Sequence, residues 1–244
     1  VDLADFKLPI LDEPQHPRLR QYQHEHTRQW APSVQGADAF VRFWNADGEE
    51  VSACGNGTRC AGWLLMQSTG KDQAVIETRA GRLVATRAGE RLVSVDMGEP
   101  RLAWEEIPLS AAHDTEALDI QLYDHPALHA APGCVSMGNP HVVFFVDDVD
   151  AVPITGIGPV GEKHALFPEH VNVGFAHVLD RGTIRLRVFV RGAGLTKACG
   201  TGACAAVVAA HRRNLADRKG TLVLGGGGLN NRWRESDRHV VLDG

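Results

Sequence analysis

The sequence has no long hydrophobic run, no cluster of basic residues and no disulfide-like cysteine framework. Its longest apolar stretches, such as Val142–Val146, are far too short to cross a bilayer. The basic residues are scattered over a chain of net charge −5, so nothing indicates a nucleic-acid partner. An odd count of five cysteines favours a reducing cytoplasm. Because Val1–Glu13 carries four acids and Pro9, we expect no signal peptide there.

What the sequence does contain is a repeat. The segment Ala53-Cys54-Gly55-Asn56-Gly57 returns as Ala198-Cys199-Gly200-Thr201-Gly202. An alternating, aromatic-bearing strand is expected before each copy and a small-residue, apolar helix after it. These strands are Phe40–Trp44 and Ile184–Phe189, followed by turns at Ala46-Asp47-Gly48 and Gly192-Ala193-Gly194. The repeat preserves a reactive residue together with its glycines, which indicates a site.

The two expected helices end at Gly70 and near Asn214, and a hairpin follows each. The predicted hairpin strands are Ala74–Thr86 with Leu92–Met97, and Thr221–Leu224 with His239–Leu242. The four-glycine run Gly225–Gly228 is interpreted as a loop. Pro100–Thr115 holds two prolines and breaks the periodicity, so it predicts a linker. The chain then divides near residue 113, into halves 1–112 and 113–244.

Each Cys-Gly pair at a helix start favours a thiolate. Free backbone N–H groups and the positive end of the helix dipole lower the pKa of a cysteine there. The same N–H groups can hold a carboxylate. Two such sites suggest two acid–base groups that invert one carbon, one thiol removing the α-proton and the other returning a proton to the opposite face. Without pyridoxal phosphate, oriented dipoles in a dry cavity must stabilise the carbanion.

The remaining cysteines suggest less. Cys60 and Cys204 lie inside the predicted helices and are expected to pack in the core, and Cys134 belongs to no motif. A zinc site built from Cys54, Cys60, Cys199 and Cys204 lacks the close paired spacing of zinc ligands, so we expect no metal.

The motifs together resemble those of the diaminopimelate epimerase family. Four of them occur in the family's order over roughly residues 40–243. They are Asn45-Ala46-Asp47-Gly48 with Cys54–Cys60, Met137-Gly138-Asn139-Pro140-His141, Phe167-Pro168-Glu169-His170-Val171-Asn172, and Ala198–Cys204.

The resemblance implies an α/β fold of two pseudo-symmetric domains, each a barrel-like, mostly antiparallel sheet around a central helix, with the site between them. It implies interconversion of LL- and meso-diaminopimelate without metal or cofactor, for lysine and peptidoglycan supply. Cys54 and Cys199 match the catalytic thiols. The matching substrate-binding residues are Asn45, Asn139, Asn172 and Arg191 for the distal end, Gly55, Asn56, Gly200 and Thr201 for the reacting carboxylate, and His141 beside the site.

The residues themselves agree about the distal end, because Arg191 between a strand and a Gly-rich turn suits a bidentate carboxylate clamp. His141 could equally be a structural histidine at a strand start. The expected partner is a small-molecule amino acid, with no nucleic acid or membrane, and a homodimer is the assembly to test.

The sequence departs from the family at three places. The usual Gly-Leu-Gly-Asn-Asp-Phe opening is absent and residues 1–38 match nothing familiar. Val190 replaces the glutamate that normally precedes the arginine of Arg191-Gly192-Ala193-Gly194. The sequence stops at His239–Gly244, before the position of the family's closing Thr-Gly-Pro-Ala segment. These departures leave three alternatives: a racemase of another amino acid on the same fold, a non-catalytic paralogue that binds or scaffolds, and a thiol-redox protein.

Overall fold

The computed structural model describes residues 26–31, 36–45, 50–51, 54–90, 92–120, 122, 128 and 131–244, and for 26–31, 45 and 51 it describes the backbone alone. The predicted turn at Ala46-Asp47-Gly48 therefore lies outside the described residues. The chain forms two compact units. Unit 1 reaches Met97 and includes Asp243–Gly244, and unit 2 runs Gly98–Leu242.

The boundary between the units falls before the expected division near residue 113, and Pro100–Thr115 is not a linker. Ile107 and Leu109 are buried in the hydrophobic core of unit 2. Arg101 forms a β-bridge with Ser136 in the same unit. The segment has no periodicity because it packs as irregular chain, and burial of its apolar side chains keeps it in unit 2.

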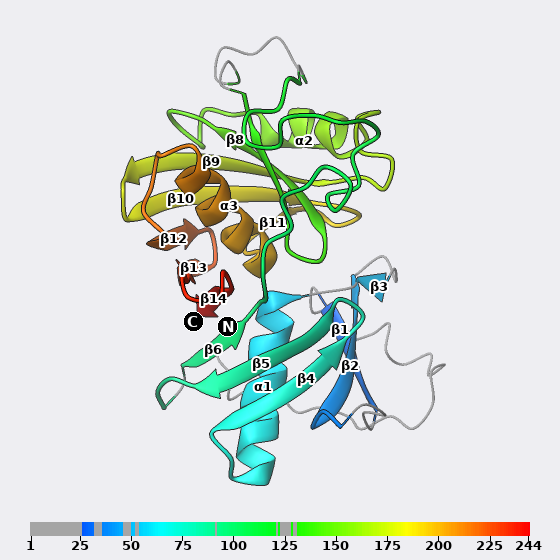
Figure 1. The fold of residues 1–244 in the computed structure, drawn as a ribbon, viewed down its shortest axis with the longest axis vertical. Coiled ribbons are helices and arrows are strands. Elements are labelled where there is room, and N and C mark those ends of the chain that lie inside the picture. The colour runs from blue at the N-terminus through cyan, green and yellow to red at the C-terminus, as the bar shows by residue number, and fades with distance from the viewer. Residues whose placement is uncertain are drawn as a thin grey trace. The chain divides into compact units, whose positions relative to one another are not determined.

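Unit 1 is a mostly antiparallel sheet with one long helix against it (Figure 1). The sheet order is β1-β2-β4-β5-β6, in which only β2 and β4 pair in parallel; β3 pairs with β2 at the side. The helix α1 contacts β4, β5 and β6. The elements are β1 (His26–Ala31), β2 (Ala39–Asn45), β3 (Glu50–Val51), α1 (Gly55–Thr69), β4 (Gln73–Thr78), β5 (Gly81–Arg87) and β6 (Val93–Asp96).

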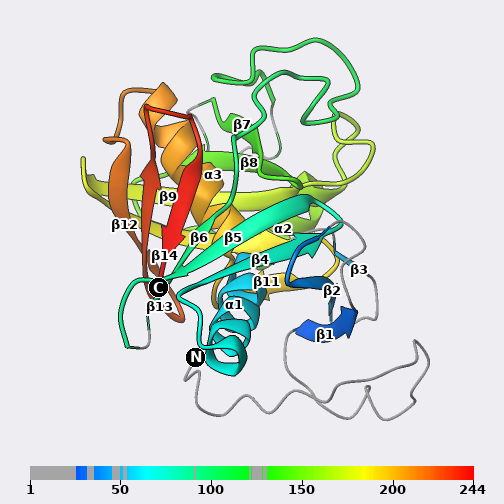
Figure 2. The same ribbon diagram turned by 60° about the horizontal axis from the view of Figure 1, so that its bottom comes forward.

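Unit 2 is built around α3, which contacts β7, β8, β9, β10, β12 and β13 (Figure 2). Parallel pairs β8–β9 and β10–β12 interrupt an otherwise antiparallel order, β13-β12-β10-β9-β8-β7. The elements are β7 (Gly133–Ser136), β8 (Pro140–Phe145), α2 (Ile154–Glu162), β9 (Asn172–Asp180), β10 (Thr183–Val190), β11 (Gly194–Thr196), α3 (Gly200–Arg212), β12 (Lys219–Leu224), β13 (Gly227–Trp233) and β14 (Val240–Asp243).

The sequence repeat is a repeat of topology. In unit 1, β2 is followed by the short return strand β3, by α1, and by β4, which pairs in parallel with β2. In unit 2, β10 is followed by β11, by α3, and by β12, which pairs in parallel with β10. Antiparallel β5 and β13 complete the two copies. The mixed α/β class predicted from the sequence is confirmed.

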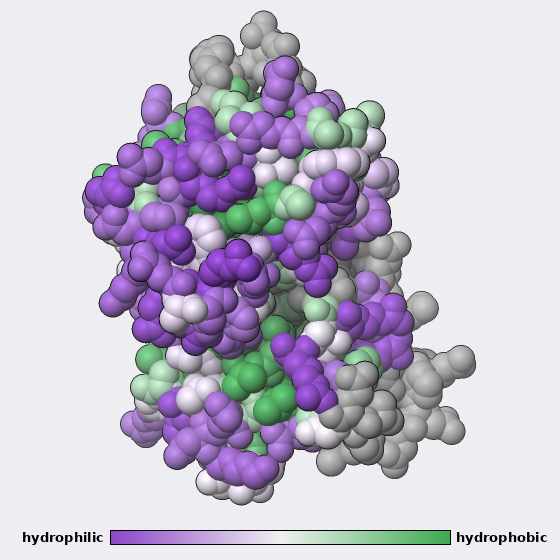
Figure 3. Space-filling model, in the orientation of Figure 1, coloured by the Kyte–Doolittle hydropathy of each residue, from purple (hydrophilic) through white to green (hydrophobic). Residues whose placement is uncertain are grey.

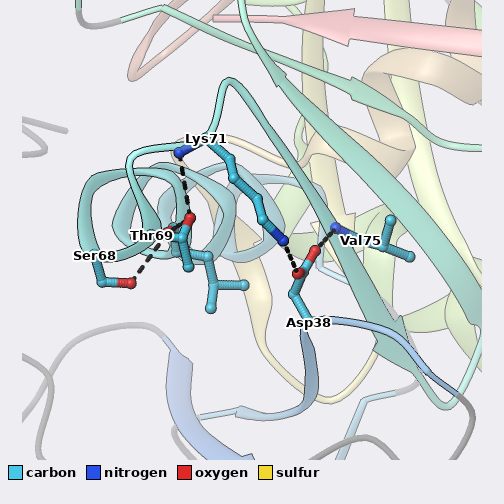
Figure 4. A network of polar contacts seen from close by, with 6 residues as sticks. Asp38, Ser68, Thr69, Lys71 and Val75 are labelled. Carbon is cyan, nitrogen blue, oxygen red and sulfur yellow. Dashed lines mark hydrogen bonds and ion pairs between the residues drawn. The ribbon is translucent and has the colours of Figure 1, made fainter.

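The end of α1 is fixed by polar groups and a glycine. Gly70 ends the helix in the left-handed conformation at φ 70°, as predicted, where a side chain would be strained. Next to it, the carboxylate of Asp38 accepts hydrogen bonds from Lys71 Nζ at 3.1 Å and Val75 N at 2.8 Å (Figure 4). The Val75 N–H, and then Lys71, hold the pKa of Asp38 below its usual value. This network joins the end of α1 to the start of β2 and to β4.

The small residues of α3 let the strands of unit 2 approach it closely. Every residue from Gly200 to Ala210 is buried. The strand β8 is also buried along its whole length, because α3 lies on one face and the core around α2 on the other. It therefore reads as a continuous apolar run instead of an alternating one.

The helix α2 is an element that the sequence did not indicate. Its segment holds Pro159 and three glycines, a composition with poor helix propensity. Packing explains it, because Gly158 lies against Phe189 and Gly161 against Leu122 and Val173 without room for a side chain. Tertiary contacts therefore override local preference here.

Three strand predictions need correction. Thr221–Leu224 does not form a hairpin with His239–Leu242, because β13 lies between β12 and β14 and pairs with β12. Ala74–Thr86 is not one strand but the hairpin of β4 and β5, because the chain turns at Arg79–Ala80 and Gly81 takes φ 122°. Gly225–Gly228 is not wholly a loop, since β13 begins at Gly227 and pairs with Leu224. The predicted helix end near Asn214 and the strand Val142–Val146 are confirmed within a few residues.

Among the described residues, the large apolar side chains that are exposed are scattered over several elements. On the face drawn in Figure 3, small hydrophobic patches lie among hydrophilic residues. The large hydrophobic side chains that are exposed in the described residues are Leu92, Val160, Leu179, Leu195, Leu215 and Val223. Among the described helices, none combines the length and apolar character needed to span a membrane.

We expect Gly62→Ala to destabilise the protein by about 1–3 kcal/mol through overpacking. A Cβ at Gly62 on α1 would lie 2.3 Å from Cβ of Ala85 on β5. The matched control is Gly156→Ala on α2, where nothing lies within 4 Å, so helix propensity alone should raise stability by up to about 1 kcal/mol. Urea unfolding of both variants measures the difference, and equal stabilities would contradict the close packing of α1 on β5.

Candidate functional site

The sulfur of Cys54 caps the first helix. Cys54 is the N-cap residue of α1, with extended backbone at φ −144° and ψ 101°. Its Sγ accepts a hydrogen bond from Gly57 N at 3.3 Å, and its carbonyl accepts from Thr58 N at 2.8 Å. An ideal Cβ at Gly57 would lie 2.6 Å from Phe43, so glycine is needed for this close turn. The thiol is thus held at the positive end of a helix.

Cys199 is built in the same way in unit 2. It is the N-cap of α3 at φ −139° and ψ 109°, and its Sγ accepts from Gly202 N at 3.3 Å. Its carbonyl accepts from Ala203 N at 2.9 Å. Cys199 is partly exposed, whereas Cys54 is buried. The sequence repeat therefore reproduces one thiol geometry twice.

The N–H groups beside each sulfur can hold an anion. Gly55 and Asn56 open α1, and Gly200 and Thr201 open α3. First-turn N–H groups have no partner within their own helix. At both helix starts they lie at the positive end of the dipole and can receive a carboxylate. The described geometry of each helix start therefore suits the role that the motifs predict for these four residues.

Arg59 adds a positive charge next to Cys54. Its Nη2 donates to Asn56 Oδ1 at 3.2 Å, while its buried Nε has no partner among the described residues. Burial lowers the pKa of Arg59, and the nearby sulfurs of Cys60 and Cys54 oppose this. The guanidinium is thus within electrostatic reach of Cys54. No equivalent exists in unit 2, where Ala203 and Cys204 follow Gly202.

A polar network in unit 2 joins three predicted residues to Cys199. Thr201 Oγ1 accepts from Asn139 Nδ2 at 3.3 Å and lies 3.1 Å from His141 Nε2. His141 Nε2 also lies 3.2 Å from Asn139 Oδ1. Thr201 Oγ1 is 3.6 Å from Cys199 Sγ. The network connects the start of β8 with the start of α3.

His141 is buried and uncharged. Its side chain lies inside unit 2 with 1% of its surface exposed. Burial, and secondly the charge of Arg191, lower the pKa of His141 to about 3. The imidazole therefore stays neutral at physiological pH. His141 lies near the start of β8 and also contacts Asn139 and Thr201.

Asn172 and Arg191 form a second group, which the sheet register connects to the first. Asn172 pairs with His141 across β8 and β9. Its Nδ2 donates to Pro140 O at 2.8 Å, and its Oδ1 accepts from Arg191 N at 3.0 Å. The guanidinium of Arg191 donates through Nη1 to Glu169 O at 2.7 Å. Asn172 thereby fixes the turn that carries Arg191.

Glu162 is a residue near the site that the motifs did not indicate. This buried carboxylate at the end of α2 accepts from Gly192 N at 2.9 Å and so holds the Arg191–Gly194 turn from the other side. The available signal was a lone acid after the apolar and small residues Ile154–Gly161. This hydrogen bond offsets part of the free-energy cost of burying the acid.

Val190 lies on the face of β10 that is turned toward α3. Ile184, Leu186 and Val188 are buried on this face, and Val188 packs beside Gly202. Side chains alternate along a strand, so Val190 shares the face of Val188 and lies close to the start of α3. The position that normally carries a glutamate is therefore on the Cys199 side.

The remaining predicted residues are placed as follows. Asn45 is the last residue of β2, and its side chain lies outside the described residues. Cys60 and Cys204 are buried within α1 and α3, as expected, and Asn231 Nδ2 donates to Cys204 Sγ at 3.2 Å. Burial raises the pKa of Cys204 to about 12, so it stays protonated. Cys134 is buried in β7.

Comparison with known proteins assigns the family. The family model described as diaminopimelate epimerase matches residues 24–103 and 133–244. The chain belongs to the diaminopimelate epimerase family. A family member named diaminopimelate epimerase from Phenylobacterium zucineum (strain HLK1) is 71% identical over 211 residues, which cover 86% of this chain and 76% of the relative. Another from Caulobacter vibrioides (strain NA1000 / CB15N) is 57% identical over 220 residues, covering 87% and 75%.

Solved structures show that the family fold extends to distant proteins. A hydroxyproline epimerase from Agrobacterium vitis with bound trans-4-OH-L-proline has a TM-score of 0.65 at 16% identity, covering 89% of this chain and 71% of that one. A phenazine biosynthesis protein of the PhzF family from Enterococcus faecalis has a TM-score of 0.66 at 14% identity, covering 96% and 86%. At these identities the likeness concerns the fold alone.

We expect His141 to make stability depend on pH. Its pKa is about 3 when folded and 6.5 ordinarily, so between these values the unfolded chain binds the extra proton. The stabilising contribution is present above about pH 6.5 and is lost as the pH falls toward 3, by at most about 1.4 kcal/mol per pH unit.

The measurement is the free energy of unfolding at several pH values for the parent and His141→Gln, which should show a shallower slope. The exposed His170, at φ 59°, gives the control His170→Asn, which should keep the parent slope. Identical slopes in parent and His141→Gln would contradict a buried neutral imidazole.

Proposed function

We propose that the protein is a cofactor-independent epimerase that interconverts LL- and meso-diaminopimelate, with Cys54 and Cys199 as its acid–base pair. The observation that carries the proposal is the duplicated thiol geometry. In each unit a cysteine sulfur caps a helix and accepts a glycine N–H at 3.3 Å. Membership of the diaminopimelate epimerase family supports the substrate.

The chemistry needs two groups of the same kind. One thiolate takes the α-proton, forming an S–H bond as the Cα–H bond breaks. The other thiol gives its proton to the opposite face of the same carbon. Because the two sulfurs exchange roles, the reaction runs in both directions. The helix N-termini supply N–H donors for the α-carboxylate, which helps to stabilise the developing carbanion.

The distal end of the substrate would be held by Asn45, Asn139, Asn172 and Arg191. A diamino-dicarboxylate carries a second carboxylate and a second ammonium group far from the reacting carbon. Arg191 offers a fork of donors for that carboxylate, and Asn172 fixes its backbone. We also propose that the enzyme acts in the cytoplasm, in the supply of lysine and peptidoglycan precursors. The odd count of five cysteines, without a disulfide framework in the sequence, supports a reducing compartment.

A racemase of another amino acid is the second candidate. The observation that favours it is Val190, which lies on the Cys199 side of β10 and provides no anionic partner for an ammonium group. Deuterium incorporation at Cα, screened over amino acids with and without a distal ammonium group, separates the two candidates. Exchange into diaminopimelate alone supports the first, and exchange only into other amino acids supports the second.

We expect Cys54→Ala and Cys199→Ala each to lower epimerisation by at least about a hundredfold, because each removes one acid–base group. The measurement is solvent-deuterium incorporation into LL-diaminopimelate together with the formation of the meso isomer. Cys60→Ala is the matched control, since Cys60 is buried in the same helix as the Cys54 cap, and it should retain activity. A Cys199→Ala variant with the parent rate would contradict the two-thiol mechanism.

We expect Val190→Glu to raise kcat/KM toward LL-diaminopimelate by about ten- to a hundredfold. A charge-assisted hydrogen bond to the distal ammonium group contributes about 1.5–3 kcal/mol. Val190→Gln is the matched control. A glutamine side chain has nearly the same shape as glutamate but no charge, so kcat/KM should rise much less in this variant. An unchanged or lower kcat/KM in a folded Val190→Glu variant would favour the alternative substrate.

A further inference from the structure

The hydroxyl group of Thr201 has its two acceptor positions occupied. A hydroxyl donates one hydrogen bond and accepts two. Asn139 Nδ2 donates to Thr201 Oγ1 at 3.3 Å, which fills the first acceptor position. With its nitrogen so engaged, the Asn139 amide directs its Oδ1 toward His141 Nε2 at 3.2 Å.

The contact with Asn139 Oδ1 determines the tautomer of His141. An amide oxygen only accepts, so Nε2 must carry the hydrogen. The same Nε2–H lies 3.1 Å from Thr201 Oγ1 and occupies its second acceptor position. Burial keeps the pKa of His141 at about 3, so the imidazole remains neutral and does not change this pattern at physiological pH.

The hydrogen of Thr201 therefore has to point away from Asn139 and His141. The group on that side is Cys199 Sγ, 3.6 Å from Thr201 Oγ1, a usual length for a hydrogen bond to sulfur. We propose that the Thr201 hydroxyl, oriented by Asn139 and His141, donates its hydrogen to the Cys199 sulfur and holds it as the thiolate in the free enzyme. Gly202 N–H, at 3.3 Å, is a second donor to the same sulfur.

Thr201 is thereby a positioning residue that affects the charge of the Cys199 sulfur. A thiolate accepts hydrogen bonds more strongly than a thiol, so a fixed donor favours the charged form. The inference rests on the proposed function and deepens it, because it makes Cys199 the base and Cys54 the acid for the isomer whose α-hydrogen faces Cys199. Cys199 takes the α-proton as the Cα–H bond breaks, and Cys54 delivers its own proton to the opposite face.

Other titratable and charged groups of unit 2 belong to the elements around Cys199. Cys204, in α3, stays protonated because burial raises its pKa to about 12. His141 on β8 is neutral, and Arg191, after β10, donates to Glu169 O. Lys197 precedes the Cys199 cap by two residues, with its carbonyl accepting from Gly226 N. In unit 1 the residue equivalent to Thr201 is Asn56, whose side-chain oxygen accepts from Arg59 instead.

The test measures the reactivity of the thiol and needs no substrate. The full-length protein is alkylated with iodoacetamide over a range of pH, and the modified peptides around Cys199 and Cys54 are quantified separately by mass spectrometry. Thr201→Val removes the hydroxyl with little change of shape. We expect it to raise the midpoint of Cys199 alkylation by about one pH unit, so that the rate below the midpoint falls about tenfold.

Three further variants test whether the hydroxyl group causes the shift of the Cys199 midpoint. Thr201→Ser restores a hydroxyl and should return the midpoint to the parent value. Thr201→Ala removes the hydroxyl in a good helix former and should repeat the shift, and it decides the matter if Thr201→Val fails to fold. Thr221→Val removes a hydroxyl on β12 that bonds Asn230 and should leave Cys199 unchanged.

An unchanged Cys199 midpoint in a folded Thr201→Val or Thr201→Ala protein would overturn the proposal, as would a shift that Thr201→Ser fails to reverse. The outcome is independent of the proposed function. If the parent does not epimerise diaminopimelate but the midpoint moves as expected, the substrate is wrong and the role of Thr201 stands. If the parent epimerises diaminopimelate and the midpoint does not move, the proposed function stands and the role of Thr201 is wrong.

Discussion

The structure depends on a backbone N–H that donates to a cysteine sulfur three residues before it. This contact, 3.3 Å in both units, makes Cys54 and Cys199 the caps of α1 and α3. It satisfies a donor that the helix cannot satisfy itself and at the same time places a thiol at the positive end of the helix dipole. One contact therefore both caps the helix and orients the thiol, and it occurs in each unit.

The strand connections around the two helices place each cysteine where this contact can form. A parallel crossover from β2 through α1 to β4, and from β10 through α3 to β12, carries each cysteine to a helix start beside the sheet. Close packing requires small residues, as at Gly57 against Phe43 and Gly202 against Val188. The glycines of the motif are thus needed both for the sulfur contact and for the approach of the helix to its strand.

The two copies differ where their side chains differ. Beside Cys199 lies a neutral network of Asn139, His141 and Thr201. Around Cys54 the partly buried Arg59 supplies a charge, and the residue in the place of Thr201 is Asn56. A duplicated fold can in this way give two chemically similar thiols unequal surroundings, as one base and one acid require.

The sequence by itself determined the features set by contacts within a few residues. These include the capped helix starts at Cys54 and Cys199, the end of α1 at Gly70 and the alternating strand that became β10. Only the tertiary structure decided the helix α2, the burial of Ile107 and Leu109 in unit 2, and two contacts, that of Gly192 N with Glu162 and that of His141 with Thr201. Periodicity and capping report local hydrogen bonds, whereas these contacts depend on strand register and packing between residues far apart in the chain.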